Sequence, residues 1–263
     1  MADVGSLKSP VLSGTLLNPV MRLRIAIIVA MVAAWEIVAV SGLLFRDVVP
    51  SWQRIAVALV ETLSEGGFYL HLWATTYEIA VGLAIGGGAG LAVGILLGAN
   101  RLLSRSFESF LYYLGPTPKI IFFPVMIMWF GVGPGSKMAM GAISCFFPIA
   151  LSTAGGMREI DRVLIRVGRS FRLSTRQMVT KIYLPAMRAP VLNGVRLGLG
   201  VALIGTLLAE TKLANQGVGF LIIQSYNTFD MPLMYSLLIV LFALAIGLNS
   251  IISRFAESDR MRR

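Results

Sequence analysis

Six arginines in a polar segment between two apolar stretches have the clearest capacity for chemistry. They follow one another at intervals of three or four residues: Arg158, Arg162, Arg166, Arg169, Arg172 and Arg176. This spacing places them on one side of a helix, with Val163, Val167 and Phe171 on the other. Guanidinium groups bind carboxylates and phosphates through two parallel hydrogen bonds. The segment from Met157 to Pro190 is therefore predicted to dock a soluble partner or to lie on anionic lipid headgroups.

Polar residues inside otherwise apolar stretches form a second group of candidates. A charged side chain within a membrane is costly, so Glu78, inside the second apolar stretch, is a candidate for a functional role. Hydroxyl and amide groups could offer hydrogen bonds to a passing solute, although Ser and Thr in membrane helices also bond their own backbone carbonyls. The candidates for a translocation pathway are Glu78, Pro124, Ser144, Thr153, Asn193, Thr206 and Glu210. For Glu78, a structural hydrogen bond to a neighbouring helix is the alternative.

The composition is that of an integral membrane protein. Of 263 residues, 56% are hydrophobic and only 14% are charged, and the mean hydropathy is +0.78. The net charge of +10 comes from Lys and Arg that flank apolar stretches, as the positive-inside rule expects, and does not indicate a nucleic-acid partner. With Cys145 and His71 as the single residues of their types, no intrachain disulfide is possible and no metal site is suggested.

The elements that must position these residues are six apolar stretches, each long enough to cross a bilayer. They cover residues 25–44, 72–99, 107–130, 137–155, 190–209 and 231–253. Prolines at 116, 118 and 124 interrupt the third stretch, which we expect in the interior because broken backbone must be covered by protein or water. The distribution of Lys and Arg predicts that both termini are cytoplasmic. The expected fold class is an all-α membrane protein with six transmembrane helices.

Glycines in the second stretch recur every four residues and predict a face for close helix packing. They are Gly82, Gly86, Gly90, Gly94 and Gly98. In the polar segment, Asp161 can cap one short helix, and Ser174 with Gln177 fits a capping box for a second. Pro185 disfavours helix at Leu184 and is expected to end that second helix.

The chain is accordingly divided into four parts. Residues 1–21 form a cytoplasmic tail, and residues 22–71 hold the first span and an outer loop that is partly helical. Residues 72–255 form the core domain, which includes the cytoplasmic loop 157–190, and residues 256–263 form a second cytoplasmic tail.

Several stretches resemble the permease of binding-protein-dependent ABC importers, in the branch that serves nitrate, sulfonate, taurine, bicarbonate and pyrimidine precursors. The most specific stretch looks like the branch's PKIAxxPLxxxWFGxGxxSK pattern, with Pro118-Lys119-Ile120, Pro124, Trp129-Phe130-Gly131, Gly133 and Ser136-Lys137. Further matches are Val49-Pro50-Ser51, Phe147-Pro148-Ile149, Ala209-Glu210 and Gly217-Val218-Gly219-Phe220.

In this family the loop before the fifth span carries the EAA motif, EAAxxxG, followed by a Leu-Pro pair. Leu184-Pro185 matches the pair, and counting back thirteen residues places Arg172 at the motif's glycine and Arg166-Val167-Gly168 at its EAA triplet. The resemblance implies that this loop couples the permease to an ATPase. The implied coupling residues are Arg166, Val167, Gly168, Arg169, Ser170, Arg172, Leu173, Ser174, Gln177, Leu184 and Pro185.

The resemblance further implies a type I ABC importer permease in the bacterial inner membrane. Its partners would be the lipid bilayer, a second copy of itself, two cytoplasmic ATPase subunits and an extracytoplasmic solute-binding protein. The chain has no GxxxxGK[ST] phosphate loop, so it is not expected to be an enzyme or to bind a cofactor. ATP and Mg would be used by the ATPase.

The expected solute is small and polar or anionic, such as nitrate, a sulfonate, taurine or bicarbonate. The alternative is a pyrimidine or thiamine precursor or an aromatic acid, because pyrimidine-precursor permeases tend to have Glu where this chain has Glu78. Two other classes are weighed: an ion-coupled secondary transporter using Glu78, and a structural membrane protein. Secondary transporters often contain inverted repeats, and no internal repeat is visible in this sequence.

Overall fold

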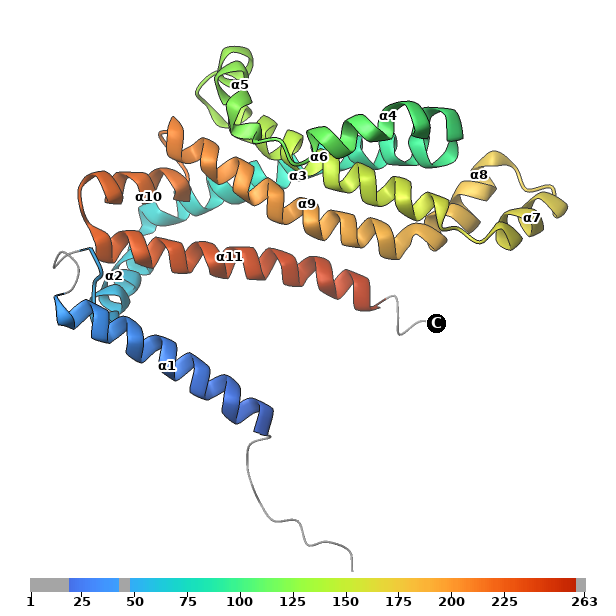
Figure 1. The fold of residues 1–263 in the computed structure, drawn as a ribbon. Helices are drawn as coiled ribbons and strands as arrows, with labels where there is room; N and C mark the ends of the chain where they lie inside the picture. The colour runs from blue at the N-terminus through green and yellow to red at the C-terminus, as the bar shows by residue number, and fades with distance from the viewer. Residues whose placement is uncertain (1–18, 43–47, 259–263) are drawn as a thin grey trace, which may run out of the picture. The chain divides into compact units, whose positions relative to one another are not determined.

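The computed structural model describes residues 19–42 and 48–258, which form helices joined by short connections (Figure 1). The chain divides at Arg54 into two compact units. The predicted tails fall largely on residues 1–18 and 259–263, which lie outside the described residues, and the cytoplasmic position of both termini stays a prediction.

The first unit contains α1 (Pro19–Ser41) and the start of α2 (Trp52–Ser64). Helix α1 is 23 residues long and apolar enough to cross a membrane. The rings of Trp35 and Trp52 lie 5.6 Å apart, and the indole N–H of Trp52 donates to the carbonyl oxygen of Val32 at 3.3 Å. Glu36 accepts a hydrogen bond from the backbone N–H of Trp52 at 3.2 Å, so this carboxylate satisfies a free donor at the first turn of α2.

The second unit is built on three long helices, α3 (Gly66–Ala99), α6 (Pro134–Arg158) and α9 (Leu184–Lys212). Helix α6 lies between the other two and makes the most extensive contacts with both (Figure 1). Helices α10 (Val218–Asn227) and α11 (Met231–Ser258) pack against α9. Buried side chains at the centre come from all three long helices, for example Ile79, Ile149 and Ala202.

The face of α3 that packs on α6 consists of the five glycines of the four-residue series. A Cβ atom at Gly90 would lie 2.7 Å from the carbonyl oxygen of Phe146, and one at Gly94 would lie 2.6 Å from that of Ala150. Both distances are shorter than van der Waals contact, so a side chain at either position would push the helices apart. Close approach of two backbones is what this spacing of small residues permits.

The third predicted span is broken into α4 (Arg101–Leu114), a short turn η1 (Lys119–Phe122) and α5 (Phe123–Phe130). The two halves are bent by 92°, and Pro116 and Pro118 lie at the bend. Lys119 donates to the carbonyl oxygens of Gly115 and Thr117, so its ammonium satisfies acceptors that the bend leaves free.

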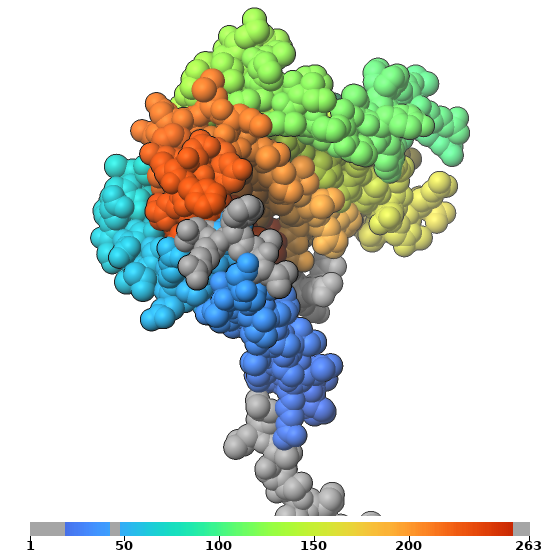
Figure 2. Space-filling view, turned by 60° about the vertical axis from the view of Figure 1, so that its left-hand side comes forward, coloured from blue at the N-terminus to red at the C-terminus, as the bar shows by residue number. Residues whose placement is uncertain are grey.

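The expected interior position of this span is wrong for α4 in the single chain, whereas α5 buries Phe123 and Met126 in a core cluster. Helix α4 has no buried residue, and the side chain of Tyr113 is 80% exposed. Figure 2 shows the green segment of α4 and α5 at the surface of the second unit. The reason is that α4 packs on α3 and α6 from one side only, and the described chain supplies nothing to cover its other face.

The prediction of six spans is confirmed in a specific form. Five helices of the described chain are long and apolar enough to cross a membrane, and the bent pair of α4 with η1–α5 makes a sixth when it is taken as one broken span. The helices extend beyond the predicted apolar stretches, because polar residues continue the helical hydrogen bonding at their ends. Helix α9, for example, begins at Leu184, whereas its predicted span begins at Pro190.

The segment between α6 and α9 contains α7 (Arg162–Ser170) and α8 (Thr175–Met178), followed by one π-helical turn, η2 (Val179–Tyr183). The prediction that Pro185 ends the second short helix is wrong. The π-turn joins α8 directly to α9, and Pro185 lies in the first turn of α9. Proline is tolerated there because the wider turn and the helix start require no hydrogen bond from its missing N–H group.

Candidate functional site

Two short helices of the loop 159–183 are held by side-chain caps. The carboxylate of Asp161 accepts the backbone N–H of Val163 at 2.8 Å. Ser174 and Gln177 form the reciprocal capping box, with the N–H of Gln177 donating to the Ser174 hydroxyl at 3.3 Å and the N–H of Ser174 donating to the Gln177 side chain at 2.9 Å. Such caps satisfy donors at the first turn of each helix, so both helices have a defined start.

The turn between α7 and α8 is a Schellman motif centred on Arg172. The N–H of Leu173 donates to the carbonyl of Gly168 at 3.1 Å, and the N–H of Arg172 donates to that of Arg169 at 2.9 Å. Arg172 itself has a φ of 50°, in the left-handed region that glycine favours. The position at which the family motif has its glycine therefore has a glycine-like backbone, although the residue is arginine.

Helix α7 packs on the following helix through Gly168. A side chain at this position would overlap Ile182 and Met178, of which Met178 is buried. The count back from Leu184-Pro185 places Gly168 at the third position of the EAA triplet. The absence of a side chain brings α7 against α8 and η2, which makes the loop one packed unit.

The outer surface of the loop combines basic and apolar side chains. Arg162, Arg166 and Arg169 are exposed on α7, and so are Val163 and Val167. Phe171, which directly follows α7, has 76% of its surface accessible. The six arginines do not form one continuous stripe, because the turn at Arg172 separates α7 from α8 and Arg158 lies at the end of α6. In Figure 1, α7 and α8 lie beyond the ends of α6 and α9.

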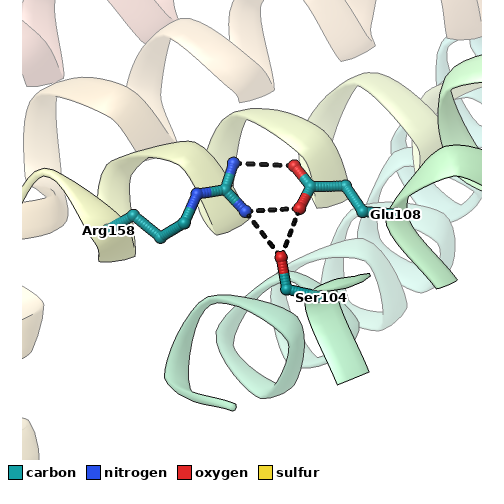
Figure 3. A network of polar contacts seen from close by, with 3 residues as sticks. All are labelled: Ser104, Glu108 and Arg158. Atoms are coloured by element: carbon teal, nitrogen blue, oxygen red, sulfur yellow. Dashed lines mark hydrogen bonds and ion pairs between the residues drawn. The ribbon is translucent and has the colours of Figure 1, made fainter. Parts of the chain in front are cut away.

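Arg158 takes part in a separate network with α4 (Figure 3). Its two terminal nitrogens donate to the two carboxylate oxygens of Glu108 at 2.5 and 2.6 Å, and one of them also donates to the hydroxyl of Ser104 at 3.1 Å. The Ser104 hydroxyl in turn donates to Glu108 at 2.6 Å. This network, which sequence reasoning missed, ties α4 to the residue that immediately precedes the loop. The spacing of Ser104 and Glu108, four residues apart, is the only signal that the sequence offers for it.

The predicted pathway residues occupy different places. Ser144, Thr153 and Thr206 are buried among the long helices, and the hydroxyls of Thr153 and Thr206 have no hydrogen-bond partner among the described residues. Asn193 lines an open cavity of about 450 Å³ between α6 and α9, together with Ser152 and Glu159 near the loop. Pro124 is exposed in the first turn of α5. The structure does not bring these residues into one site.

Glu78 and Glu210, by contrast, share a buried cluster at the end of the second unit away from the loop. Both carboxyls are almost inaccessible, with 3% and 1% of their surface exposed. Glu210 accepts hydrogen bonds from the Thr75 hydroxyl at 2.7 Å and from the N–H of Gly219 at 2.6 Å. Glu78 lies close enough to interact electrostatically with Glu210 and with Lys137.

The start of α10 covers this cluster with consecutive backbone donors. The N–H of Gly217 donates to His71 Nδ1 at 3.2 Å, that of Val218 to the Thr75 hydroxyl at 2.7 Å, and that of Gly219 to Glu210. A side chain at Gly217 or Gly219 would overlap the side chain of Glu210. Glycine is therefore required at both positions for the backbone to approach the carboxylate.

Sequence reasoning missed His71, Thr75 and Lys137 as partners in this cluster. Lys137 is 2% exposed and donates to the carbonyl oxygens of Val132 and Gly133 in the turn after α5. The sequence did contain a signal for His71 and Thr75. Residues 71, 75 and 78 extend the glycine series of α3 backwards along one helix face, at intervals of four, three and four residues up to Gly82.

The comparison with known families decides the class of the protein. Residues 88–258 match the family described as the binding-protein-dependent transport system inner membrane component. The chain belongs to this family. It is a multi-pass membrane permease of the ABC importer class, as the resemblance in the sequence predicted.

Similar permeases with named solutes come from several bacteria. The chain is 31% identical to a putative aliphatic sulfonates transport permease protein, SsuC, of Bacillus subtilis, over 74% of this chain and 70% of that protein. It is 28% identical to the taurine transport system permease protein TauC of Escherichia coli, over 87% of this chain and 86% of that protein. A third relative, the formylaminopyrimidine transport permease protein ThiX of Halalkalibacterium halodurans, is 28% identical over 75% of this chain and 78% of that protein.

A solved structure supports the fold of this permease. A chain of the MetNI methionine ABC transporter in inward-facing conformations superimposes with a TM-score of 0.58 and 21% sequence identity, covering 78% of this chain and 97% of that chain. At this identity the likeness concerns the arrangement of the helices alone.

Proposed function

We propose that the permease imports a small organic or inorganic anion of the sulfonate, taurine or nitrate type, in an ATP-driven transporter. The observation that carries this proposal is the similarity to sulfonate and taurine permeases, which extends over 74% and 87% of the chain. A nitrate import permease protein, NrtB, of Synechococcus elongatus is also similar, at 25% identity over 74% of this chain. The solutes of these relatives are small and negatively charged at neutral pH, with the exception of zwitterionic taurine.

The loop 159–183 is proposed to dock one of two cytoplasmic ATPase subunits, which would bind the ATP and Mg. Three features support this role: the helices have caps at their starts, the turn between them is closed by two hydrogen bonds, and Gly168 packs them together. A preformed surface loses little conformational entropy on binding. Its exposed Phe171 and Val167 suit an apolar groove, while the neighbouring arginines suit acidic residues at the edge of that groove.

A second copy of the chain is proposed to cover α4 and α5. Irregular backbone at membrane depth must be covered by protein or by a water-filled cavity, and the bend between Leu114 and Lys119 lies beside a helix that has no buried residue. Aromatic side chains on both helices are exposed, among them Tyr113 and Trp129. A homodimer through this region would bury them and enclose a route between the two copies.

The docking proposal is tested by reconstituting the permease with its ATPase and binding protein in nanodiscs. Charge reversal at Arg166, Arg169 and Arg176 is expected to weaken assembly with the ATPase and to abolish the stimulation of ATP hydrolysis by loaded binding protein. Lys212→Glu is the matched control, because it makes the same type of charge change on an exposed residue at the other end of α9. Normal assembly and stimulation in the reversed variant would assign the arginines to lipid headgroups instead.

The solute is identified by a thermal-shift screen of the binding protein that works with this permease. Sulfonates, taurine and nitrate are expected to raise its melting temperature, and the same solute should then be taken up by vesicles only when ATP is present. A response to formylated pyrimidines alone would favour the second candidate, a thiamine precursor, which the similarity to ThiX supports. Uptake that follows a proton gradient without ATP would contradict the importer mechanism and favour an ion-coupled carrier.

A further inference from the structure

The cluster around Glu78 has more buried negative charge than positive charge. It contains the carboxyls of Glu78 and Glu210 and the ammonium of Lys137, each at most 3% exposed. His71, at the edge of the cluster, accepts the Gly217 N–H through Nδ1, so that this nitrogen carries no proton. Helices α4 and α10 also pack against α3, but among the described residues only Glu210 of α9 and Lys137 of α6 act electrostatically on Glu78. One ammonium can compensate one carboxylate. A second carboxylate without compensation would be very unfavourable in this environment, so the cluster must bind one more positive charge.

The hydrogen bonds favour Glu210 as the ionised carboxyl. Glu210 accepts two donors, the Thr75 hydroxyl at 2.7 Å and the Gly219 N–H at 2.6 Å, as a carboxylate does. The Thr75 hydroxyl has only one proton, and the Val218 N–H already donates to its oxygen. Glu78 differs, because its buried Oε2 atom has no hydrogen-bond partner among the described residues. An oxygen without a donor is unsuited to a full negative charge.

A metal ion does not fit the cluster as the extra charge. Among the residues that the structure describes, no group of three or more His, Cys, Asp and Glu side chains could hold a metal. Hard cations such as Ca²⁺ require six or more oxygen ligands, and the ammonium of Lys137 would repel any cation beside it. A proton needs only one oxygen, and two carboxyls in contact commonly share one.

We propose that Glu78 and Glu210 form an acid pair that binds a single proton, carried by Glu78, and that this proton allows the first turn of α10 to close over the end of the bundle. Closure places Gly219 against Glu210. A second negative charge under the first turn of α10 would need water to solvate it, and this water would hold the turn open. The protonated form of Glu78 is neutral and can donate to Glu210, which leaves only the charge that Lys137 compensates. Closure of this end is thereby linked to pH, whatever solute the permease carries.

The test is infrared spectroscopy of the full-length permease in lipid nanodiscs, with melting temperatures measured in parallel. A protonated carboxyl has a carbonyl band separate from those of carboxylates and amides, and we expect this band in the wild type at neutral pH. Glu78→Gln should lose the band and keep its melting temperature, because glutamine has the shape and neutrality of the protonated acid. As the pH rises, the wild type should lose both the band and stability, since its folded form binds a proton that the unfolded chain releases. Glu78→Gln should lack this loss of stability.

Glu210→Gln is the matched control. It removes the carboxylate that accepts from Thr75 and Gly219, so its melting temperature should fall by several degrees at every pH, unlike that of Glu78→Gln. The proposal is overturned if the acid band survives in Glu78→Gln, or if Glu78→Gln melts as low as Glu210→Gln. It is also overturned if Na⁺ or K⁺ at constant ionic strength and pH raises the wild-type melting temperature, because a metal ion would then supply the charge.

Discussion

Replacing Arg172 by glycine is expected to stabilise the turn between α7 and α8. Arg172 has a φ of 50° within a Schellman motif, and residues with a Cβ atom pay about 1–2 kcal/mol for that conformation. Glycine adopts it without strain. The local opening of the turn should therefore become about five to thirty times rarer, since about 1.4 kcal/mol corresponds to a factor of ten.

Hydrogen–deuterium exchange on the permease in nanodiscs measures this opening. The N–H groups of residues 172 and 173 are bonded to carbonyls of α7, so their exchange reports on the motif. Arg172→Gly should slow exchange at residue 173 by about the factor derived above. Arg172→Ala is the control, because it removes the guanidinium and keeps the strain.

The comparison of the glycine and alanine variants separates strain from charge. If both exchange at the same rate, the left-handed backbone at Arg172 costs nothing and the reasoning is refuted. If both bind the ATPase more weakly than the wild type, the guanidinium contributes directly to docking. A glycine variant that binds more tightly than the alanine variant would show that a preformed turn favours docking.

Two further predictions concern helix packing and the network in Figure 3. A methyl group at Gly86 would overlap the backbone of Ala142, whereas one at Gly88 would enter open space. Gly86→Ala is therefore expected to destabilise the permease by about 2 kcal/mol, and Gly88→Ala by less than about 0.5 kcal/mol. Similar melting temperatures of the two variants would contradict the packing of α3 on α6. For Glu108 and Arg158, a double-mutant cycle with alanine should give a coupling of about 1 kcal/mol that decreases in high salt, as is usual for a well-aligned but accessible ion pair. A coupling of zero in low salt would mean that the network does not hold α4 in place.

The architecture could be predicted because its main signals are long and periodic. Six apolar stretches, a four-residue glycine series and prolines inside the third stretch led to the span count, and the caps at Asp161 and Ser174 are formed in the structure. The left-handed backbone of Arg172, the residue that the count back from Leu184-Pro185 places at the motif's glycine, was not predicted, because arginine gives no local hint of such a backbone. The confirmed inferences depend on local periodicity or spacing, which a single sequence contains.

The polar clusters could not be predicted in the same way. Lys137 follows a glycine-rich turn, a position typical of an exposed residue, and its burial depends on α3 and α9 packing around it. The bond between Thr75 and Glu210 joins residues 135 positions apart. The continuation from α8 into α9 depends on a π-turn, which no residue pattern announces. Each of these features requires knowledge of which helix faces meet.

The continuous helix formed by α8, the π-turn and α9 can transmit movement from one end of the second unit to the other. Helix α8, the π-turn and α9 together run from Thr175 to Lys212, a span of 38 residues, which at about 1.5 Å per residue makes an arm of about 57 Å. The loop proposed to meet the ATPase is at one end of this arm, and Glu210 is near the other. A tilt of about 5° around its middle would move each end by about 2.5 Å in opposite directions, which is enough to separate Glu210 from its donors on Thr75 and Gly219. Movement of the loop by the ATPase would then be coupled, through one continuous helix, to the release of a proton from the acid pair at the opposite end of α9.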